Sequence, residues 1–310
     1  MIRIYFTSPG TNHIDLLNRL KYNTPKLKGI WKDIEGTTDI NNFDYMVILD
    51  DLHKNLLDMG QNKFLTTIKN LDNLIYFQRE NTHLIKQGSW FRKNILVKLN
   101  NNYSYEDNYM FTFTSANFLN KSYDELKALK YPNKTKNLSA IVSSKDFGDT
   151  YKKRKNFLIN YSNKNENIDI YGRGWNKAIL GNNYKGELDS KFDGLILYNY
   201  SICLENFPNE KITSEKITDA LLCWCLPIYS GSIYTDKLYP SNSFKLIDIN
   251  TDKCIENVVN ISNNNITQNQ INAIGNAREL ILDKYNIWEQ IYQIIHNKKN
   301  FDLLYKYTCN

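Results

Sequence analysis

The chain has 310 residues, which predicts two domains at about 150 residues per domain. Its 39 lysine and arginine residues exceed the 33 aspartate and glutamate residues by six. That excess is too small and too dispersed for a protein that coats a polyanion, but it suits a small phosphorylated substrate. A composition of 42% hydrophobic and 23% charged residues excludes wholesale disorder.

Several features bear on where the protein works. No uninterrupted apolar run approaches the roughly 18 residues of a membrane span. The first ten residues, MIRIYFTSPG, lack the apolar core of a signal peptide and are typical of a first strand. Five cysteines, an odd number in a long chain, argue against a disulfide framework. We therefore expect a soluble protein of a reducing compartment.

In the first half of the chain, apolar stretches rich in β-formers alternate with stretches of helical period, which is the pattern of α/β folds. The expected strands are Ile2–Thr7, Phe43–Leu49, Leu74–Gln78 and Met110–Thr114. The expected helices are Ile14–Tyr22, Phe64–Leu71 and Ser122–Lys130. Phe43–Leu49 is almost continuously apolar, as a strand covered on both faces would be.

The second half repeats this alternation after a polar, proline-containing passage, Tyr131–Asn137. The expected strands are Leu138–Ser143, Ile168–Tyr171, Tyr200–Leu204, Pro227–Ser230 and Phe244–Ile249, and the expected helices are Tyr151–Tyr161, Ser214–Cys225 and a tail over Ile271–Tyr305. We expect domains at 1–137 and 138–310, doubly wound and facing each other across a cleft. In such sheets, ligands lie outside the carboxyl ends of the strands.

The most informative segment is Tyr198–Gly231, which reads as a strand, a polar turn, a helix opening with Ser214-Glu215-Lys216, and a second strand. A helix N-terminus presents unpaired N–H groups and a positive dipole end, which favour an anion. Lys216 adds a charge suited to phosphate, while Glu215 and Asn206 can bind sugar hydroxyls. The alternative is structural: Ser214 only caps the helix, and the two charged residues only face solvent.

The run SICLENFPNEKITSEKITDALLCWCLPIYSGS resembles the donor-binding signature of family 10 glycosyltransferases, the α1,3/4-fucosyltransferases. The shared elements are Glu-Asn after a strand, Ser-Glu-Lys at a helix start, and a strand of the form Pro-Ile-x-x-Gly. Upstream, Ser143 and Ser144 followed by Arg154 resemble the family's Val-x-Ser-Asn…Arg element, and Tyr171-Gly172 resembles its strand-end turn. The resemblance is good over about Ser139–Ile249 and thin before it.

The resemblance implies a GT-B type α/β fold, with two facing Rossmann-like domains and, in this chain, a C-terminal helical tail. It implies an N-terminal acceptor-binding domain and a C-terminal domain that binds the donor, GDP-fucose, with inversion at the anomeric carbon. Arg154 and Lys216 match the positions that neutralise the pyrophosphate. The donor-binding positions carried over are Ser143, Ser144, Arg154, Tyr171, Gly172, Asn206, Ser214, Glu215 and Lys216. One departure is Ile212, which replaces a tyrosine common in the family.

Inverting transfer needs a carboxylate that takes the proton of the attacking hydroxyl. Glu80 follows a strand in YFQREN and resembles the family's base position. The alternative makes it an ordinary loop acid paired with Arg79 or Lys86. Asp50 and Asp51, at the end of another strand, are the reserve candidates for the base.

Other candidate residues carry weaker signals. His83 follows Glu80 closely and is a candidate for the acceptor site, against the alternative of a plain loop histidine. The four histidines are scattered, Cys223-x-Cys225 has the wrong spacing for zinc, and the donor half has no convincing Asp-x-Asp, so we expect no essential metal and no cofactor. The basic run Lys152–Lys155 indicates the surroundings of a phosphate-binding arginine, and not nucleic acid.

The sequence thus favours a soluble inverting glycosyltransferase, which we expect to move fucose from GDP to a glycan hydroxyl, in a bacterial or viral cytoplasmic setting. The expected partners are a nucleotide-sugar donor and a glycan acceptor, without nucleic acid or an integral membrane segment. Two alternatives stay open: a transferase of the same fold with another nucleotide sugar, and a non-catalytic glycan-binding module.

Overall fold

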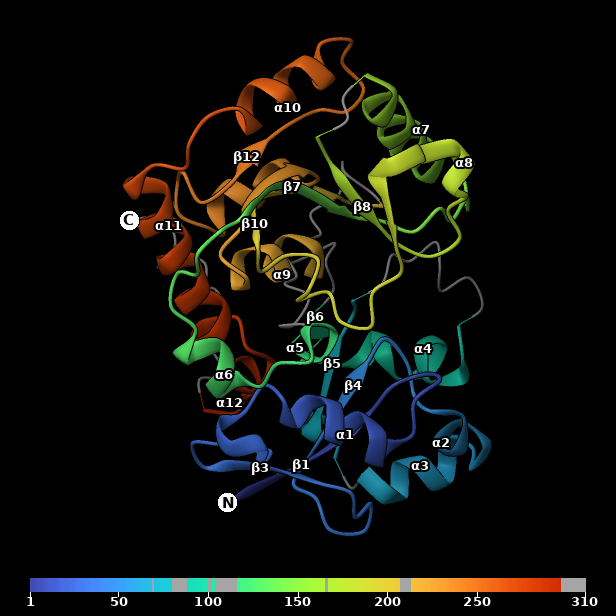
Figure 1. Ribbon diagram of the computed structural model, residues 1–310. Helices are drawn as coiled ribbons and strands as arrows, with labels where there is room; N and C mark the ends of the chain where they lie inside the picture. The colour runs from blue at the N-terminus through green and yellow to red at the C-terminus, as the bar shows by residue number, and fades with distance from the viewer. Residues whose placement is uncertain are drawn as a thin grey trace. The chain divides into compact units, whose positions relative to one another are not determined.

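The computed structural model describes residues 1–68, 70–79, 88–99, 102–103, 116–164, 167–206 and 213–296. The chain divides into two compact units (Figure 1). Unit 1 comprises the described residues of Met1–Thr112, Ser122–Asp124 and Tyr285–Tyr307. Unit 2 comprises those of Phe113–Lys121 and Glu125–Lys284. Within the described residues, each unit holds one six-stranded sheet.

The sheet of unit 1 has the order β2-β3-β1-β4-β5-β6 and is parallel except for the β2–β3 pair. Its strands are β1 (Ile2–Thr7), β2 (Ile30–Trp31), β3 (Ile34–Thr37), β4 (Tyr45–Leu49), β5 (Leu74–Phe77) and β6 (Asn102–Tyr103). Its helices include α1 (His13–Lys21), α2 (Lys54–Asp58), α3 (Gln61–Ile68), α4 (Trp90–Asn94) and α12 (Ile287–His296). Met46–Leu49 of β4 is fully buried, as a central parallel strand covered on both faces should be.

The sheet of unit 2 has the order β12-β11-β10-β7-β8-β9, and every pair in it is parallel. Its strands are β7 (Lys136–Ile141), β8 (Asp169–Tyr171), β9 (Tyr184–Gly186), β10 (Tyr198–Leu204), β11 (Leu226–Ser230) and β12 (Lys245–Leu246). Numbered within the unit, this is the 3-2-1-4-5-6 order of a Rossmann sheet. The strand order reverses between β7 and β10, where such folds place a nucleotide.

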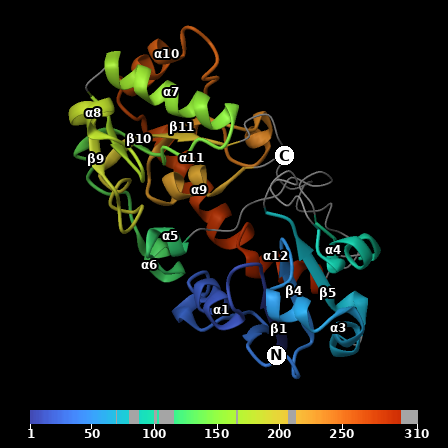
Figure 2. The same ribbon diagram turned by 90° about the vertical axis from the view of Figure 1, so that its right-hand side faces the viewer.

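The helices of unit 2 are α5 (Ala116–Leu119), α7 (Asp149–Lys164), α8 (Lys177–Leu180), α9 (Glu215–Leu222), α10 (Cys254–Ser262) and α11 (Gln268–Glu279), and α6 (Tyr123–Ala128) begins in unit 1 and continues into it. In both views α7 and α10 lie on one face of the sheet and α9 on the other, with α11 beside α9 (Figure 1 and Figure 2). The prediction of an α/β fold with two Rossmann-like domains is confirmed.

The division into units differs from the expected boundary after residue 137. Residues 125–137 belong to unit 2, whereas α12, expected in the C-terminal domain, belongs to unit 1. The reason is the packing of α12. The indole of Trp288 is fully buried and donates to the carbonyl of Leu20 at 2.9 Å, and Glu289 accepts from the indole of Trp31 at 2.6 Å. These contacts join the helical tail to α1 and β2.

Two further expectations need correction. The helix expected over Ser214–Cys225 ends at Leu222, because the chain turns at Trp224, whose φ is +62°. The strands β2, β3 and β9 were not expected, because they are only two to four residues long and so carry little periodicity. The strand expected at Met110–Thr114 lies outside the described residues.

Candidate functional site

The carboxyl ends of β7 and β10 mark the predicted ligand-binding edge of unit 2. β10 ends at Leu204, and Glu205 and Asn206 follow it directly. Ser214 caps α9, its hydroxyl accepting from the N–H of Lys216 at 3.3 Å. Parallel pairing of β7, β10 and β11 brings these ends to one edge of the sheet. The sequence-predicted donor residues of this segment therefore gather at the switch point of the strand order.

Glu205 is the centre of this edge, and it is 5% exposed. Its carboxylate accepts from the backbone N–H of Ser214 at 2.8 Å, from the Ser214 hydroxyl at 2.6 and 2.7 Å, and from the phenol of Tyr229 at 3.2 Å. The ammonium of Lys216 is 3.3 Å from the same carboxylate. The donors at Ser214 that the sequence assigned to a phosphate are thus bonded to Glu205, which sequence reasoning did not name.

Gly231, at the end of β11, makes room for this arrangement. A Cβ atom at this position would lie 2.2 Å from the phenol of Tyr229 and 2.6 Å from Cγ of Glu205. Such distances are far below van der Waals contact, so a side chain here would push Tyr229 and Glu205 out of place. The glycine of the Ser-Gly pair at the end of this strand is therefore required for steric reasons.

An alternating series of charges continues from Glu205 along α9. Lys216 lies 3.6 Å from Glu215, Lys191 lies 3.3 Å from the same oxygen of Glu215, and Lys191 lies 2.8 Å from Asp219. We call Glu205, Lys216, Glu215, Lys191 and Asp219 the charge ladder. Burial alone would raise the pKa of Glu215, but Lys216 and Lys191 together hold it well below its ordinary value. Burial likewise disfavours the ionised form of Lys191, yet Asp219 and Glu215 raise its pKa.

Arg154, from α7, is the third cation of the site. The residue is 5% exposed, and its Nε and Nη1 atoms make no hydrogen bond within the described part of the chain. Its guanidinium carbon is 5.4 Å from the ring centroid of Tyr151. Burial lowers the pKa of Arg154, and Glu205 and Glu215 oppose that shift electrostatically. A buried arginine with two unsatisfied donors is costly unless an anion binds it.

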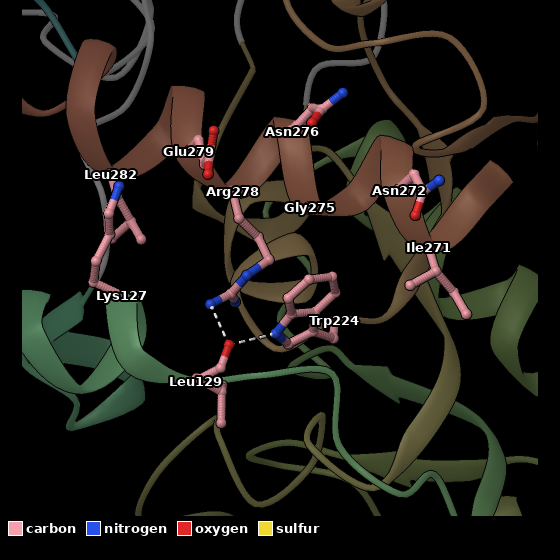
Figure 3. Close-up of a pocket in the computed structure, with 10 residues that line it drawn as sticks. All are labelled: Lys127, Leu129, Trp224, Ile271, Asn272, Gly275, Asn276, Arg278, Glu279 and Leu282. Atoms are coloured by element: carbon pink, nitrogen blue, oxygen red, sulfur yellow. Dashed lines mark hydrogen bonds between the residues drawn. The ribbon is translucent and has the colours of Figure 1, made fainter. Parts of the chain in front are cut away.

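A second buried arginine, Arg278 on α11, shows the opposite situation. Its guanidinium donates to the carbonyls of Leu222, Leu126 and Leu129 and lies 4.5 Å from the ring centroid of Trp224. In Figure 3 Arg278 and the indole of Trp224 both point to the Leu129 carbonyl, beside a cavity of about 520 Å³. Arg278 therefore connects helices through these hydrogen bonds. Within the described ranges, Nε and Nη1 of Arg154 have no such carbonyl partners, so these two atoms can bind a ligand.

The carboxyl ends of β7 and β8 hold the remaining predicted donor residues. Gly172 has a φ of +144°, and a Cβ there would lie 2.1 Å from the Val142 carbonyl oxygen, so only glycine fits. The Ser144 hydroxyl donates to the carbonyl of Gly174 at 2.6 Å and shapes the same turn. Ser143, which directly precedes Ser144, is half-buried.

Tyr171 does not join this group. Its phenol is 2.7 Å from the phenol of Tyr198, which donates to Asp169 at 2.6 Å, and Lys136 also binds Asp169. The Tyr171 side chain is therefore buried in a network that includes the first residues of β7, β8 and β10. The strand-end turn therefore involves the backbone of Tyr171 and not its phenol.

The predicted base, Glu80, and the acceptor-site candidate, His83, lie outside the described residues. The reserve acids follow β4. Asp50, with φ +70°, accepts from the guanidinium of Arg79 at 2.7 and 2.9 Å. Asp51 accepts from the N–H of Leu52 and the hydroxyl of Ser89, both at 2.8 Å, and burial raises its pKa. Asp50 is engaged in an ion pair, and Asp51 is the stronger reserve for a proton acceptor.

Within the described residues, no group of three or more histidine, cysteine, aspartate or glutamate side chains is arranged to hold a metal ion. Cys223 and Cys225 are fully buried, and the thiol of Cys225 contacts the carbonyls of Leu195 and Tyr198. The absence of an essential metal stays a prediction. No helix in the described ranges combines the length and the apolarity needed to cross a membrane.

Comparison with known proteins gives fold-level similarity. No protein-family model and no curated protein matches the sequence. One similar solved structure is an α1,3-fucosyltransferase, 16% identical, covering 92% of each chain, with a TM-score of 0.48. Another is a DNA-modifying β-glucosyltransferase, 10% identical, covering 94% of this chain and 98% of the other, with a TM-score of 0.49. A third is S. aureus TarM bound to fondaparinux, α-GlcNAc-glycerol and UDP, 14% identical, covering 81% of this chain and 54% of the other, with a TM-score of 0.44. Values this low carry neither a substrate nor a reaction over to this chain.

Proposed function

We propose that this protein is an inverting glycosyltransferase of the α1,3/4-fucosyltransferase type, which moves fucose from GDP-fucose to a glycan hydroxyl. The observation that carries the proposal is the guanidinium of Arg154, 5% exposed and with two nitrogens unpartnered in the described part of the chain. Arg154 belongs to α7, the helix that follows β7 at the switch point of the strand order, and Glu205 and Glu215 act on it electrostatically. The ligand that suits a buried cation at this position is the diphosphate of a nucleotide.

The charges around Arg154 suit a diphosphate leaving group. Three cations, Arg154, Lys191 and Lys216, face three carboxylates, those of Glu205, Glu215 and Asp219. The site is therefore close to neutral, and a diphosphate must draw its stabilisation from the cations that can turn toward it. Arg154 and Lys216 are those cations. Fixed positive groups aimed at a leaving diphosphate lower the barrier for its departure, because charge develops there in the transition state.

The choice of GDP-fucose comes from the resemblance of the segment around Glu205–Gly231 to the family signature. The family's pyrophosphate positions correspond to Arg154 on α7 and Lys216 on α9, two helices that follow strands of one sheet and begin at its carboxyl edge. The positions expected to contact donor hydroxyls correspond to Asn206 and Glu215, at the same edge. The arrangement supports the family's donor geometry, although Ile212 departs from the family pattern.

The proposed chemistry is a single displacement. The acceptor oxygen forms a bond to the anomeric carbon as the bond from that carbon to the diphosphate oxygen breaks, and the configuration inverts. The proton of the acceptor hydroxyl passes to a carboxylate, which we assign to Glu80, with Asp51 as the reserve. The electron pair of the broken bond leaves with GDP, next to Arg154 and Lys216.

The direct test incubates the protein with isotope-labelled GDP-fucose and an array of glycans, with and without EDTA. We expect labelled glycan carrying fucose in the inverted configuration, formed equally well with EDTA. Transfer from UDP- or dTDP-sugars but not from GDP-fucose would replace the donor while keeping the reaction. Glycan binding without transfer from any donor would identify a binding module and overturn the proposal.

A further inference from the structure

Lys191 stands out because it lies in a segment without helical or strand periodicity and yet enters the charge ladder. Its backbone N–H donates to the carbonyl of Phe118 at 3.0 Å, and its ammonium is 4.8 Å from the Phe118 ring centroid. The neighbouring Ser190 hydroxyl donates to the Leu119 carbonyl at 2.7 Å. The segment that carries Lys191 is thereby fixed on α5 before its side chain reaches α9.

The ammonium of Lys191 binds two acids of α9 at once. It is 2.8 Å from Asp219, whose side chain is 2% exposed, and 3.3 Å from Glu215. Glu215 and Asp219 are four residues apart and so lie on one face of the helix. If Lys191 were removed, the charge ladder would keep one cation, Lys216, which already binds Glu205.

We infer that Lys191 is a positioning residue of the proposed diphosphate site: it neutralises Asp219 and part of Glu215, so that Lys216 stays available for the diphosphate. The inference rests on the proposed function. The cations on either side of Glu215 share a single carboxylate oxygen, so loss of one draws the other closer. The loss also leaves the site with three carboxylates and two cations, which repels an incoming polyanion.

The test measures binding of GDP and of inorganic pyrophosphate by calorimetry, for the full chain and its variants. We expect Lys191→Met to bind both ligands about 10-fold more weakly or worse, since one unit charge a few ångströms away changes affinity by at least this factor in a partly buried site. Lys191→Arg keeps the charge and should bind within about threefold of the unchanged protein. Lys185→Met, which removes a lysine paired with Asp169, is the matched control and should bind normally.

A second variant separates electrostatics from folding. In Lys191→Met/Asp219→Asn the carboxylate that has lost its cation is gone, so affinity should recover to within about threefold of the unchanged protein. Equal affinity of Lys191→Met and the unchanged protein would overturn the inference and leave the proposed function in place. Failure of the double variant to recover, with both variants folded by circular dichroism, would also overturn it. If the unchanged protein binds neither ligand, the proposed function falls, and the inference with it.

Discussion

The carboxylate of Glu205 accepts the backbone N–H of Ser214 at 2.8 Å, so the anion at the N-terminus of α9 is one that the protein itself supplies. The same carboxylate holds Lys216 at 3.3 Å. A diphosphate at this edge would therefore meet an already organised set of charges, and Nε and Nη1 of Arg154 have no hydrogen-bond partner in the part of the chain that the structure describes.

The first prediction contrasts Arg154 with Arg278, both of which are buried. Arg154→Met removes a desolvated charge with unpartnered nitrogens, so it should leave the free energy of unfolding unchanged or raise it. It should weaken GDP binding by about 10- to 100-fold, because a charge-assisted contact is lost. Chemical denaturation and calorimetry measure the two effects.

Arg278→Met is the matched control for that experiment. It deprives the carbonyls of Leu222, Leu126 and Leu129 of a buried donor and should cost about 3 kcal/mol of stability, with GDP affinity unchanged in the folded protein. Should Arg154→Met lose stability while keeping its GDP affinity, Arg154 would be structural and the assigned phosphate site wrong.

The second prediction concerns the base. Glu80→Gln should lower turnover by about 10²- to 10⁴-fold and leave GDP affinity intact, because the amide cannot accept the proton. Asp51→Asn is the comparison, since burial raises the pKa of Asp51 and makes it the reserve base. A loss of turnover in Asp51→Asn with normal turnover in Glu80→Gln would transfer the role to Asp51.

The third prediction is a pH dependence. Despite its burial, the pKa of Glu215 is lower in the folded protein than its ordinary value of 4.5, because Lys216 and Lys191 stabilise the carboxylate. The unfolded chain therefore binds more protons below that pH, and the stabilisation is fully present above it and fades as the pH falls. The stability difference between the unchanged protein and Glu215→Gln should accordingly shrink between pH 6 and about pH 3. A difference that grows on acidification would contradict the ion pairing.

The fourth prediction tests the turn after β8. In Gly172→Ala the new Cβ meets the Val142 carbonyl oxygen at 2.1 Å, and we expect a loss of about 3 kcal/mol in the free energy of unfolding. Gly148→Ala has a similar φ of +131° but open space around the Cβ, so it should cost only about 1 kcal/mol. Equal losses in the two variants would mean that backbone strain, and not the contact with Val142, sets the requirement.

Much of the fold was predictable because its central strands are long and apolar. The runs around Met46–Leu49 and Tyr200–Leu204 are buried on both faces, so their continuous apolar sequences can be recognised as strands without tertiary information. The short strands β2, β3 and β9 depend on pairing with their neighbours, which no local pattern records. The same holds for α12, whose sequence is that of an amphipathic helix, while its place in unit 1 depends on Trp288 and Glu289 meeting α1 and β2.

The site was predictable where a motif is continuous in sequence. Ser214, Glu215 and Lys216 lie where the pattern put them, and the Glu-Asn pair after β10 pointed to Asn206. The acid of that pair, Glu205, was not predicted as a site residue. It could have been, because a carboxylate at the end of a buried strand needs partners, and Ser214 and Lys216 are close in sequence. Lys191 could not be found in this way, because only the fold brings it to α9.

The most direct measurement is a thermal-shift screen of the unchanged protein against GDP, UDP, CMP, dTDP and their sugars. A ligand that binds only the folded state raises the melting temperature according to its affinity and concentration. We expect a shift with GDP and GDP-fucose that is absent from Arg154→Met. A shift with UDP or dTDP alone would contradict the proposed donor, and no shift with any nucleotide would contradict the diphosphate site itself.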